Sequence, residues 1–281
     1  MKYAFISGAA GGIAGAIVDG LDKKGDWTVF AGYHHTPIDM SKYSERIIPV
    51  YIDVTDQASC DAAADEIRKH VDHLDAIVNV SGWHTMGSLV EDNPSATVEK
   101  IININCLGYV RTNQALFPLA EKCKGRIINF SSECGFEQPQ PFNAPYAISK
   151  FAVEAYTIGL RRELAFLGMK VIKIQPGSFK TGMHSEAWAG YDKILETTSR
   201  YADVLNVLKP MMSVAMAHPH DLKHIVNCTV NAMETSHPKT NYRCKTTWYL
   251  RAIDPIPPKV IDAGYKYVVG GLGAIAKKIK K

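Results

Sequence analysis

The chain has 281 residues, of which 46% are hydrophobic and 21% are charged, and its formal net charge is +4. This composition is typical of a soluble globular protein, and no stretch approaches the roughly 20 apolar residues that span a bilayer. Four lysines among the last five residues account for the net charge, so the sequence gives no support to a nucleic-acid-binding protein.

The cysteines and histidines show no pattern of a disulfide framework or a metal site. The six cysteines form no C-x-x-C pair, and of the ten histidines only His34 and His35 are adjacent. We therefore expect reduced thiols and no bound metal. The first residues, MKYAFISGAAGG, run directly into a predicted strand and a glycine loop without a removable leader, which predicts a cytoplasmic protein.

Apolar, β-prone runs recur along the chain between helix-like segments. They are residues 3–7, 27–32, 46–52, 75–80, 126–131 and 170–175. Runs that are nearly continuous in Val, Ile and Phe indicate strands buried on both faces, and their alternation with helices indicates right-handed βαβ units. We therefore predict an α/β fold over residues 1–270: a single-domain, Rossmann-like, doubly wound parallel sheet with helices on both faces.

A glycine loop, SGAAGGIAG at residues 7–15, follows the first predicted strand and leads into a helix. Gly8 and Gly12 would let the backbone approach a pyrophosphate, whose charge the open N–H groups of the helix start would meet. The loop therefore suggests a dinucleotide site, and a tight turn without a ligand is the alternative.

Tyr146 and Lys150 are four residues apart in a helix that Pro145 is predicted to open. This spacing places both side chains on one helical face, so that they could address the same bound molecule. On spacing alone, a solvated pair on the protein surface is the alternative.

The strand and helix alternation stops between residues 182 and 225, in a stretch rich in Met, Trp, Tyr and Leu. A long insertion of this kind predicts a helical lid over a binding site. Residues 271–281 form a basic C-terminal tail that we expect to be frayed and solvated. Contact of this tail with an anionic membrane surface is the alternative.

Together these motifs resemble the short-chain dehydrogenase/reductase family from residue 3 to about residue 181. The family's T-G-x-x-x-G-x-G reads SGAAGGIA here, with alanine in place of the last glycine; N-N-A-G reads NVSG at residues 79–82, and P-G-x-x-x-T begins at Pro176. The resemblance implies an NAD(P)-dependent alcohol dehydrogenase or carbonyl reductase. The catalytic residues that it implies are Asn105, Ser132, Tyr146 and Lys150.

In this chemistry a proton must be handed to or from the substrate oxygen while hydride moves at carbon. We expect Lys150, aided by the cationic nicotinamide, to lower the pKa of the Tyr146 phenol by two to three units, which corresponds to roughly 3 to 4 kcal/mol. By the resemblance, Lys150 also bonds the nicotinamide ribose, Ser132 orients the substrate oxygen, and Asn105 positions a water linked to Lys150.

The resemblance also implies a nicotinamide dinucleotide. The residues expected to contact it are Ser7, Gly8, Gly12, Ile13, Tyr33, His34, His35, Asp53, Val54, Asn79, Tyr146, Lys150, Pro176, Gly177 and Thr181. The second predicted strand ends without the carboxylate that would repel a 2′-phosphate, so we favour NADP(H). NAD(H) is the alternative, because no Arg or Lys follows that strand, and so is a pair of exposed histidines without a ligand.

Residues expected near the substrate are His84, Glu133, Phe142 and Met183, with Trp83, Cys134, Met211 and Met212 around them. Such an apolar lining suits a bulky lipophilic alcohol or ketone. The chain is similar to the branch with 17β-hydroxysteroid, retinol and 3-hydroxybutyrate dehydrogenases. Core packing, a small hydroxy-acid substrate and a non-catalytic dinucleotide sensor are the alternatives.

Ile148, Ala152, Ala155 and Gly159 follow helical spacing after the predicted active site. In the family the corresponding helix packs against a second subunit, which implies a homodimer or homotetramer. Burial of this face within one chain is the alternative.

Overall fold

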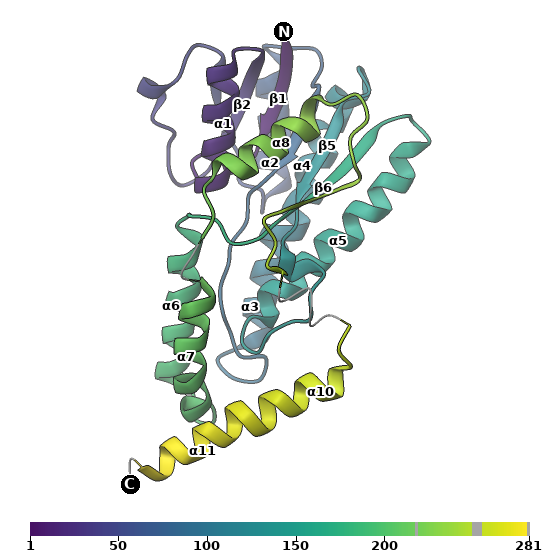
Figure 1. Cartoon of the computed structure of the whole chain (residues 1–281). Coiled ribbons are helices and arrows are strands. Elements are labelled where there is room, and N and C mark those ends of the chain that lie inside the picture. Colours follow the sequence, from purple (N-terminus) through teal and green to yellow (C-terminus); the bar gives the residue numbers. More distant parts are fainter. Residues whose placement is uncertain (217–218, 249–254, 280–281) are drawn as a thin grey trace.

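The computed structural model describes residues 1–216, 219–248 and 255–279. Seven parallel strands form one sheet in the order β3-β2-β1-β4-β5-β6-β7 (Figure 1). The strands are β1 (Lys2–Ile6), β2 (Trp27–Tyr33), β3 (Ile47–Tyr51), β4 (Ala76–Asn79), β5 (Arg126–Phe130), β6 (Lys170–Pro176) and β7 (Asn241–Cys244). The order reverses between β1 and β4, and in open parallel sheets ligands bind beyond the carboxyl ends of the strands at such a point.

Helices cover both faces of the sheet. Helices α1 (Gly12–Lys24) and α8 (Lys223–Glu234) pack together on one face, and α2 (Gln57–Arg68), α4 (Gly108–Glu121) and α5 (Ala144–Ala165) lie on the other. Alternation along the strands supplies both cores: in β1, Ala4 and Ile6 pack toward α1, whereas Phe5 packs toward α2 and α4. The predicted doubly wound fold, with burial on both faces, is confirmed.

Two long helices extend from the carboxyl end of the sheet and form the predicted lid (Figure 1). They are α6 (Met183–Thr197) and α7 (Ala202–Met216). α8 begins at Lys223 and packs back onto the sheet, so the helices of the lid end before residue 225. Shorter elements are the 3₁₀ helices η1 (Met40–Lys42) and η3 (Glu133–Gly135), helix α3 (Pro94–Ile102) and the π-helix η2 (Asn103–Leu107).

The described C-terminal segment is one helical arm, which crosses beneath the lid in Figure 1 and packs against α7 through its last helix. It consists of α10 (Pro258–Ala263), the π-helical turn η4 (Gly264–Val269) and α11 (Gly270–Ile279). Of the tail at residues 271–281 that was expected to be frayed, residues 271–279 are helical, and residues 280–281 lie outside the described part of the chain. Within the residues that the structure describes, no helix has the length and apolarity needed to cross a membrane.

The sequence missed the seventh strand. All six predicted runs form strands, each within one or two residues of the expected bounds. β7 has no apolar run, because it lies at the edge of the sheet and its sequence NYRC is exposed or half-buried except at Cys244. An edge strand carries little of the hydrophobic pattern that reveals buried strands.

Candidate active site

Tyr146, Lys150 and Ser132 line one cavity beyond the carboxyl ends of β4, β5 and β6. Pro145 lies in the first turn of α5, where its missing N–H costs no helical hydrogen bond. The helix begins at Ala144, two residues before Tyr146, and its first two turns hold Tyr146 and Lys150 at the cavity wall. The Lys150 Nζ donates to the Phe130 carbonyl oxygen at 3.0 Å and lies 5.7 Å from the Tyr146 ring centroid.

Burial shifts the pKa values of these two groups in opposite directions. It raises the pKa of the Tyr146 phenol well above its usual value, and a hydrogen bond with Ser132 acts in the lowering direction without overcoming it. It lowers the pKa of the Lys150 ammonium to about 8. Without a nicotinamide, desolvation therefore keeps the pKa of the phenol high. The lowering expected from Lys150 together with the cationic nicotinamide stays a prediction.

Asn105 lies in the π-helix η2, and its amide is engaged by the protein. Its Oδ1 accepts from the Trp83 backbone N–H at 2.7 Å, and its Nδ2 donates to the Trp83 carbonyl and to the Ser149 hydroxyl, both at 2.9 Å. Asn105 thus joins α5 to the loop that follows β4. Its expected role in positioning a water remains a prediction.

The Glu133 carboxylate is held by hydrogen bonds from Thr247. Its carboxylate accepts from the Thr247 backbone N–H at 2.7 Å and from the Thr247 hydroxyl at 3.2 Å. Burial raises the pKa of this carboxyl group. Beside it, the Ser132 hydroxyl accepts from the Cys134 backbone N–H at 3.2 Å, which fixes the position of that hydroxyl at the end of β5.

The cavity encloses about 1140 Å³ together with its solvent-open mouth, and its wall is mainly apolar. Of the expected substrate residues, His84, Glu133 and Met183 line it, whereas Phe142 does not. Phe142 has a left-handed backbone (φ +63°) and packs edge-on against Tyr201 of the lid, with ring centroids 5.3 Å apart. Lining residues that the sequence did not indicate include Val80, Met86, Gln140, Asn143 and Phe179.

His84 contacts Tyr146 directly. Its ring lies 4.1 Å from the Tyr146 ring, at an interplanar angle of 31°. The Nε2 of His84 is 2.9 Å from the Oδ1 of Asn143, and the Nδ2 of Asn143 donates to the Cys134 sulfur at 3.6 Å. These contacts hold one face of the Tyr146 ring, so its hydroxyl has a fixed direction.

Of the other residues expected around the substrate, Cys134 and Met212 line the cavity. Trp83 and Met211 are not among its lining residues. Lys100 covers the Trp83 ring at 4.5 Å, and the Met211 side chain is exposed on α7.

A second cavity continues from the first along the glycine loop. Ile13, Val80, Thr181 and Met183 line both cavities. Of the expected dinucleotide residues, this second cavity is lined by Gly8, Gly12, Ile13, Tyr33, His34, His35, Val54 and Thr181, and the first by Ile13, Tyr146, Lys150, Pro176, Gly177 and Thr181. Together they form one groove from His35 to Tyr146.

The glycine loop has the geometry of a phosphate cradle. Gly8 has φ +73°, and a Cβ there would lie 3.1 Å from the Cα of Ser81. A Cβ on Gly12 would lie 2.8 Å from the Cγ2 of Thr181. α1 starts without a side-chain cap and without an acidic residue in its first turn, which leaves its N–H groups open to an anion. These residues fit a dinucleotide pyrophosphate.

Ser7 and Asn79 support the groove from behind and do not line it. The Ser7 hydroxyl accepts from the backbone N–H groups of Val80 and Ser81 at 3.0 and 3.1 Å, which ties the end of β1 to the loop after β4. The Asn79 side chain is buried in the core, where its Nδ2 donates to Asn113 and Asn129 at 2.8 and 2.9 Å. Neither of these two side chains reaches the cavity that the sequence assigned to it.

At the far end of the groove, the His34 and His35 rings stack with centroids 3.8 Å apart. Asp53 lies behind them, with its Oδ2 3.5 Å from the Nε2 of His34, and is not among the lining residues. Burial raises the pKa of Asp53, but hydrogen bonds from Thr55 and the charges of the two histidines act against it and the pKa is lowered overall. The carboxylate therefore stays ionised beside His34.

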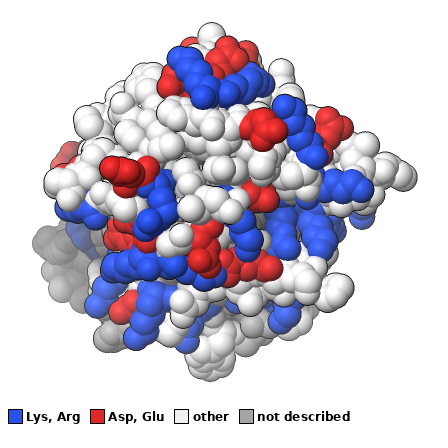
Figure 2. Space-filling model, turned by 90° about the horizontal axis from the view of Figure 1, so that it is seen from above, with Lys and Arg blue, Asp and Glu red and all other residues white. Residues whose placement is uncertain are grey.

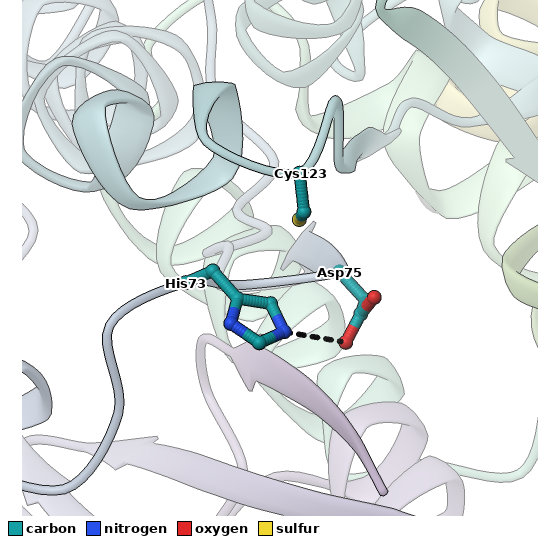
Figure 3. A group of neighbouring side chains, drawn as sticks. All are labelled: His73, Asp75 and Cys123. Atoms are coloured by element: carbon teal, nitrogen blue, oxygen red, sulfur yellow. Dashed lines mark ion pairs between the residues drawn. The ribbon is translucent and has the colours of Figure 1, made fainter.

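One group among the described side chains could share a metal ion: His73, Asp75 and Cys123 (Figure 3). The Nε2 of His73 and the Oδ2 of Asp75 are 3.8 Å apart. Asp75 also accepts from the Tyr3 backbone N–H, and the Cys123 thiol donates to the Leu74 carbonyl oxygen. His73 and Asp75 lie just before β4, at the amino ends of the strands, whereas Tyr146 lies beyond their carboxyl ends, so the group takes no part in the site above.

Comparison with known proteins gives relatives across most of the chain. The model of the short chain dehydrogenase family matches residues 2–192. Retinol dehydrogenase 16 of Mus musculus is 30% identical over 254 residues, covering 86% of this chain and 80% of that protein. The 17-beta-hydroxysteroid dehydrogenase type 6 of Homo sapiens is 28% identical over 257 residues, with the same coverages of 86% and 80%.

Solved structures share the fold. A short-chain dehydrogenase from Streptomyces avermitilis superposes with a TM-score of 0.73 at 21% identity, covering 97% of each chain. A short chain dehydrogenase from Burkholderia cenocepacia in complex with NADP superposes with a TM-score of 0.67 at 19% identity, covering 97% of this chain and 99% of that one.

Proposed function

The chain belongs to the short-chain dehydrogenase family, an oxidoreductase family that uses NAD(P), and from this premise we propose that it interconverts a lipophilic secondary alcohol and its ketone. The observation that carries the proposal is one continuous groove, with Gly8 and Gly12 at one end and Tyr146, Lys150 and Ser132 at the other. A dinucleotide sensor needs the first part of this groove but not the second.

The chain's own residues account for the proton transfer. When a dinucleotide is bound, its nicotinamide donates or accepts the hydride. In the direction of reduction, the Tyr146 phenol gives its proton to the substrate oxygen, and the Ser132 hydroxyl donates a hydrogen bond to the same atom. The Lys150 ammonium, one helical turn away, stabilises the phenolate that remains. The stacked His84 ring keeps the phenol aimed at the substrate.

The lining of the cavity supports a lipophilic substrate. Val80, Met86, Phe179, Met183 and Met212 provide apolar, adaptable walls, which suit a ring system or a long hydrocarbon. Gln140 and Asn143 offer polar contacts at the same cavity. The relatives named for retinol and hydroxysteroid dehydrogenation support the same substrate class.

For the dinucleotide we propose NADP(H). β2 ends at Tyr33 without a carboxylate, and both imidazoles that follow line the groove where a 2′-phosphate would lie. Asp53 offsets part of that attraction, since its carboxylate lies 3.5 Å from His34. We therefore expect a modest preference, which the ratio of kcat/KM for NADPH and NADH measures.

We also propose a cytoplasmic homo-oligomer that associates through α5. Ile148, Phe151 and Ala155 are exposed along one side of this helix, and a Cβ on Gly159 would meet nothing within 4 Å. Ala152, predicted on the same side, is half-buried and packs within the chain. Apolar exposure beside an open glycine allows a second helix to approach closely. Sedimentation equilibrium of the parent and of Phe151→Glu tests this proposal. It would be refuted if the parent were a monomer, like the variant.

The test of the activity is turnover with NADPH or NADH and a panel of steroid ketones, retinoid aldehydes and acetoacetate, followed by nicotinamide absorbance. We expect Tyr146→Phe to lower kcat by about 10²- to 10⁴-fold while retaining dinucleotide binding. Tyr156→Phe is the matched control, because Tyr156 lies on the same helix but accepts from Asn113 outside the groove.

Turnover by Tyr146→Phe at the parent rate would show that the mechanism is wrong. Dinucleotide binding by the parent without turnover of any carbonyl in the panel would favour the sensor.

A further inference from the structure

The outer side of the C-terminal arm carries a row of exposed apolar side chains. Val260, Tyr267, Val268, Leu272 and Ile275 are between 49% and 69% exposed. Along the arm, successive steps of four, four, four and three residues join Val260, Gly264, Val268, Leu272 and Ile275. This spacing places them on one side of the helix, and the π-helical turn η4 lies within the row.

A different side of the arm holds it to the lid. Val269 is buried, and a Cβ on Gly273 would lie 3.3 Å from backbone atoms of Asp203 in α7. The arm is therefore anchored through Val269 and Gly273, and the exposed row takes no part in that anchoring. Large apolar residues that gather on one unpartnered surface mark an interaction site.

The C-terminal segment of the sequence that contains the arm also carries the net positive charge of the protein. Residues 255–281 contain six lysines and one aspartate, a net charge of +5, whereas the chain carries +4, so residues 1–254 together carry −1. On the face seen from above, Lys and Arg are interspersed with Asp and Glu (Figure 2). The last four lysines, Lys277, Lys278, Lys280 and Lys281, directly follow the exposed row in the sequence.

Two partners could cover this surface: a second copy of the chain or a lipid membrane. The charge of the segment favours the membrane. In a two-fold dimer the same patch meets itself, so two segments of +5 would face each other and repel. An anionic lipid surface attracts the lysines while the apolar row enters the boundary between headgroups and acyl chains.

We propose that the α10–α11 arm is an amphipathic helix that docks the protein on an anionic membrane surface. This inference does not depend on the proposed reaction, because it rests on the arm alone. The arm also contacts α7, which contributes Met212 to the substrate cavity. Docking through this face therefore places the lid, and not the opposite edge of the sheet, next to the lipid.

The experiment is co-sedimentation of the full chain with vesicles of phosphatidylcholine alone or of equal parts phosphatidylcholine and phosphatidylserine. One variant replaces the row (Val268→Ser, Leu272→Ser, Ile275→Ser), and a second replaces the four terminal lysines with glutamine. The matched control is Phe166→Ser with Leu167→Ser. It removes exposed apolar side chains between the end of α5 and the start of β6, at the amino ends of the strands and away from the lid. Thermal melting of each variant checks that it folds.

We expect the parent and the control to pellet with the anionic vesicles, and each arm variant to partition at least about tenfold more weakly. Added salt should weaken binding of the parent, because screening acts on the lysine contribution. Failure of the parent to pellet, or pelleting of the row variant like the parent, would overturn the proposal. Equal binding to both kinds of vesicle would overturn the role of the lysines.

A parent that stays in the supernatant and is a dimer, dissociated by the row variant, would assign the face to a second copy of the chain. None of these outcomes alters the Tyr146 test, since turnover is measured with substrate added in solution.

Discussion

Replacing Asn79 with alanine should destabilise the fold and leave the dinucleotide site largely intact. The Asn79 Nδ2 donates to the Oδ1 atoms of Asn113 and Asn129, at 2.8 and 2.9 Å. Asn113 in turn donates to the Tyr156 hydroxyl and Asn129 to the Thr157 hydroxyl. The network joins β4 and β5 to α4 and α5, and alanine would leave two buried carbonyl oxygens without their donor.

Each buried acceptor left without a donor costs about 1 to 3 kcal/mol. Two such acceptors and a small cavity amount to about 3 to 5 kcal/mol of unfolding free energy. With an unfolding entropy of about 2.1 cal/mol/K per residue over 281 residues, this loss lowers the melting temperature by about 5 to 8 °C. Differential scanning calorimetry of the parent and Asn79→Ala measures the shift.

Asn206→Ala is the matched control, because Asn206 is exposed on α7 and makes a local bond to the Ala202 carbonyl. We expect that variant to melt within about 1 °C of the parent. The reasoning would be refuted if Asn79→Ala melted like the parent and bound the dinucleotide at least about tenfold more weakly. That result would indicate that Asn79 contacts the dinucleotide, as the sequence suggested.

Two further predictions concern the groove. The Lys150 ammonium, whose pKa burial lowers to about 8, is charged below that pH and neutral above it, so the rate of carbonyl reduction should fall as the pH rises through this value; a flat profile between about pH 7 and about pH 9 would contradict this. Gly12→Ala should weaken dinucleotide binding, measured by calorimetric titration, by about tenfold or more, because its Cβ would meet Thr181 at 2.8 Å. Gly159→Ala, where a Cβ meets nothing within 4 Å, should bind like the parent.

Residues that act through regular elements could be placed from the sequence. Tyr146 and Lys150 share a face because helical spacing fixes their relation, and Gly8 and Gly12 line the groove because they join the first strand to its helix. Alternation in β4 also held a signal about Asn79 that the motif obscured. Val78 packs toward α1 and Ile77 packs toward the opposite face. Because side chains alternate along a strand, Asn79 points to the same face as Ile77, where α4 and α5 lie.

Residues in turns could not be placed, because their partners lie far away in the chain. Glu133 lines the cavity as expected, but its carboxylate is bound by Thr247, which is 114 residues distant. Phe142 has the composition of a pocket residue, yet its left-handed backbone turns it onto Tyr201 of the lid. No local pattern encodes either contact, since both depend on how the lid and the segment after β7 return to the site.

The opposite pKa shifts of Tyr146 and Lys150 bear on how one site serves both directions of a reversible reaction. With protein groups alone, Tyr146 holds its proton at neutral pH, which is the state needed to protonate a carbonyl oxygen. Acting as a base, the phenol must first lose that proton, and only additional positive charge nearby lowers its pKa. An oxidised nicotinamide carries such a charge and a reduced one does not, so the phenol would be a donor beside the reduced ring and a readier base beside the oxidised ring. The buried Lys150, whose own pKa lies near neutrality, can give or take the balancing proton in either case.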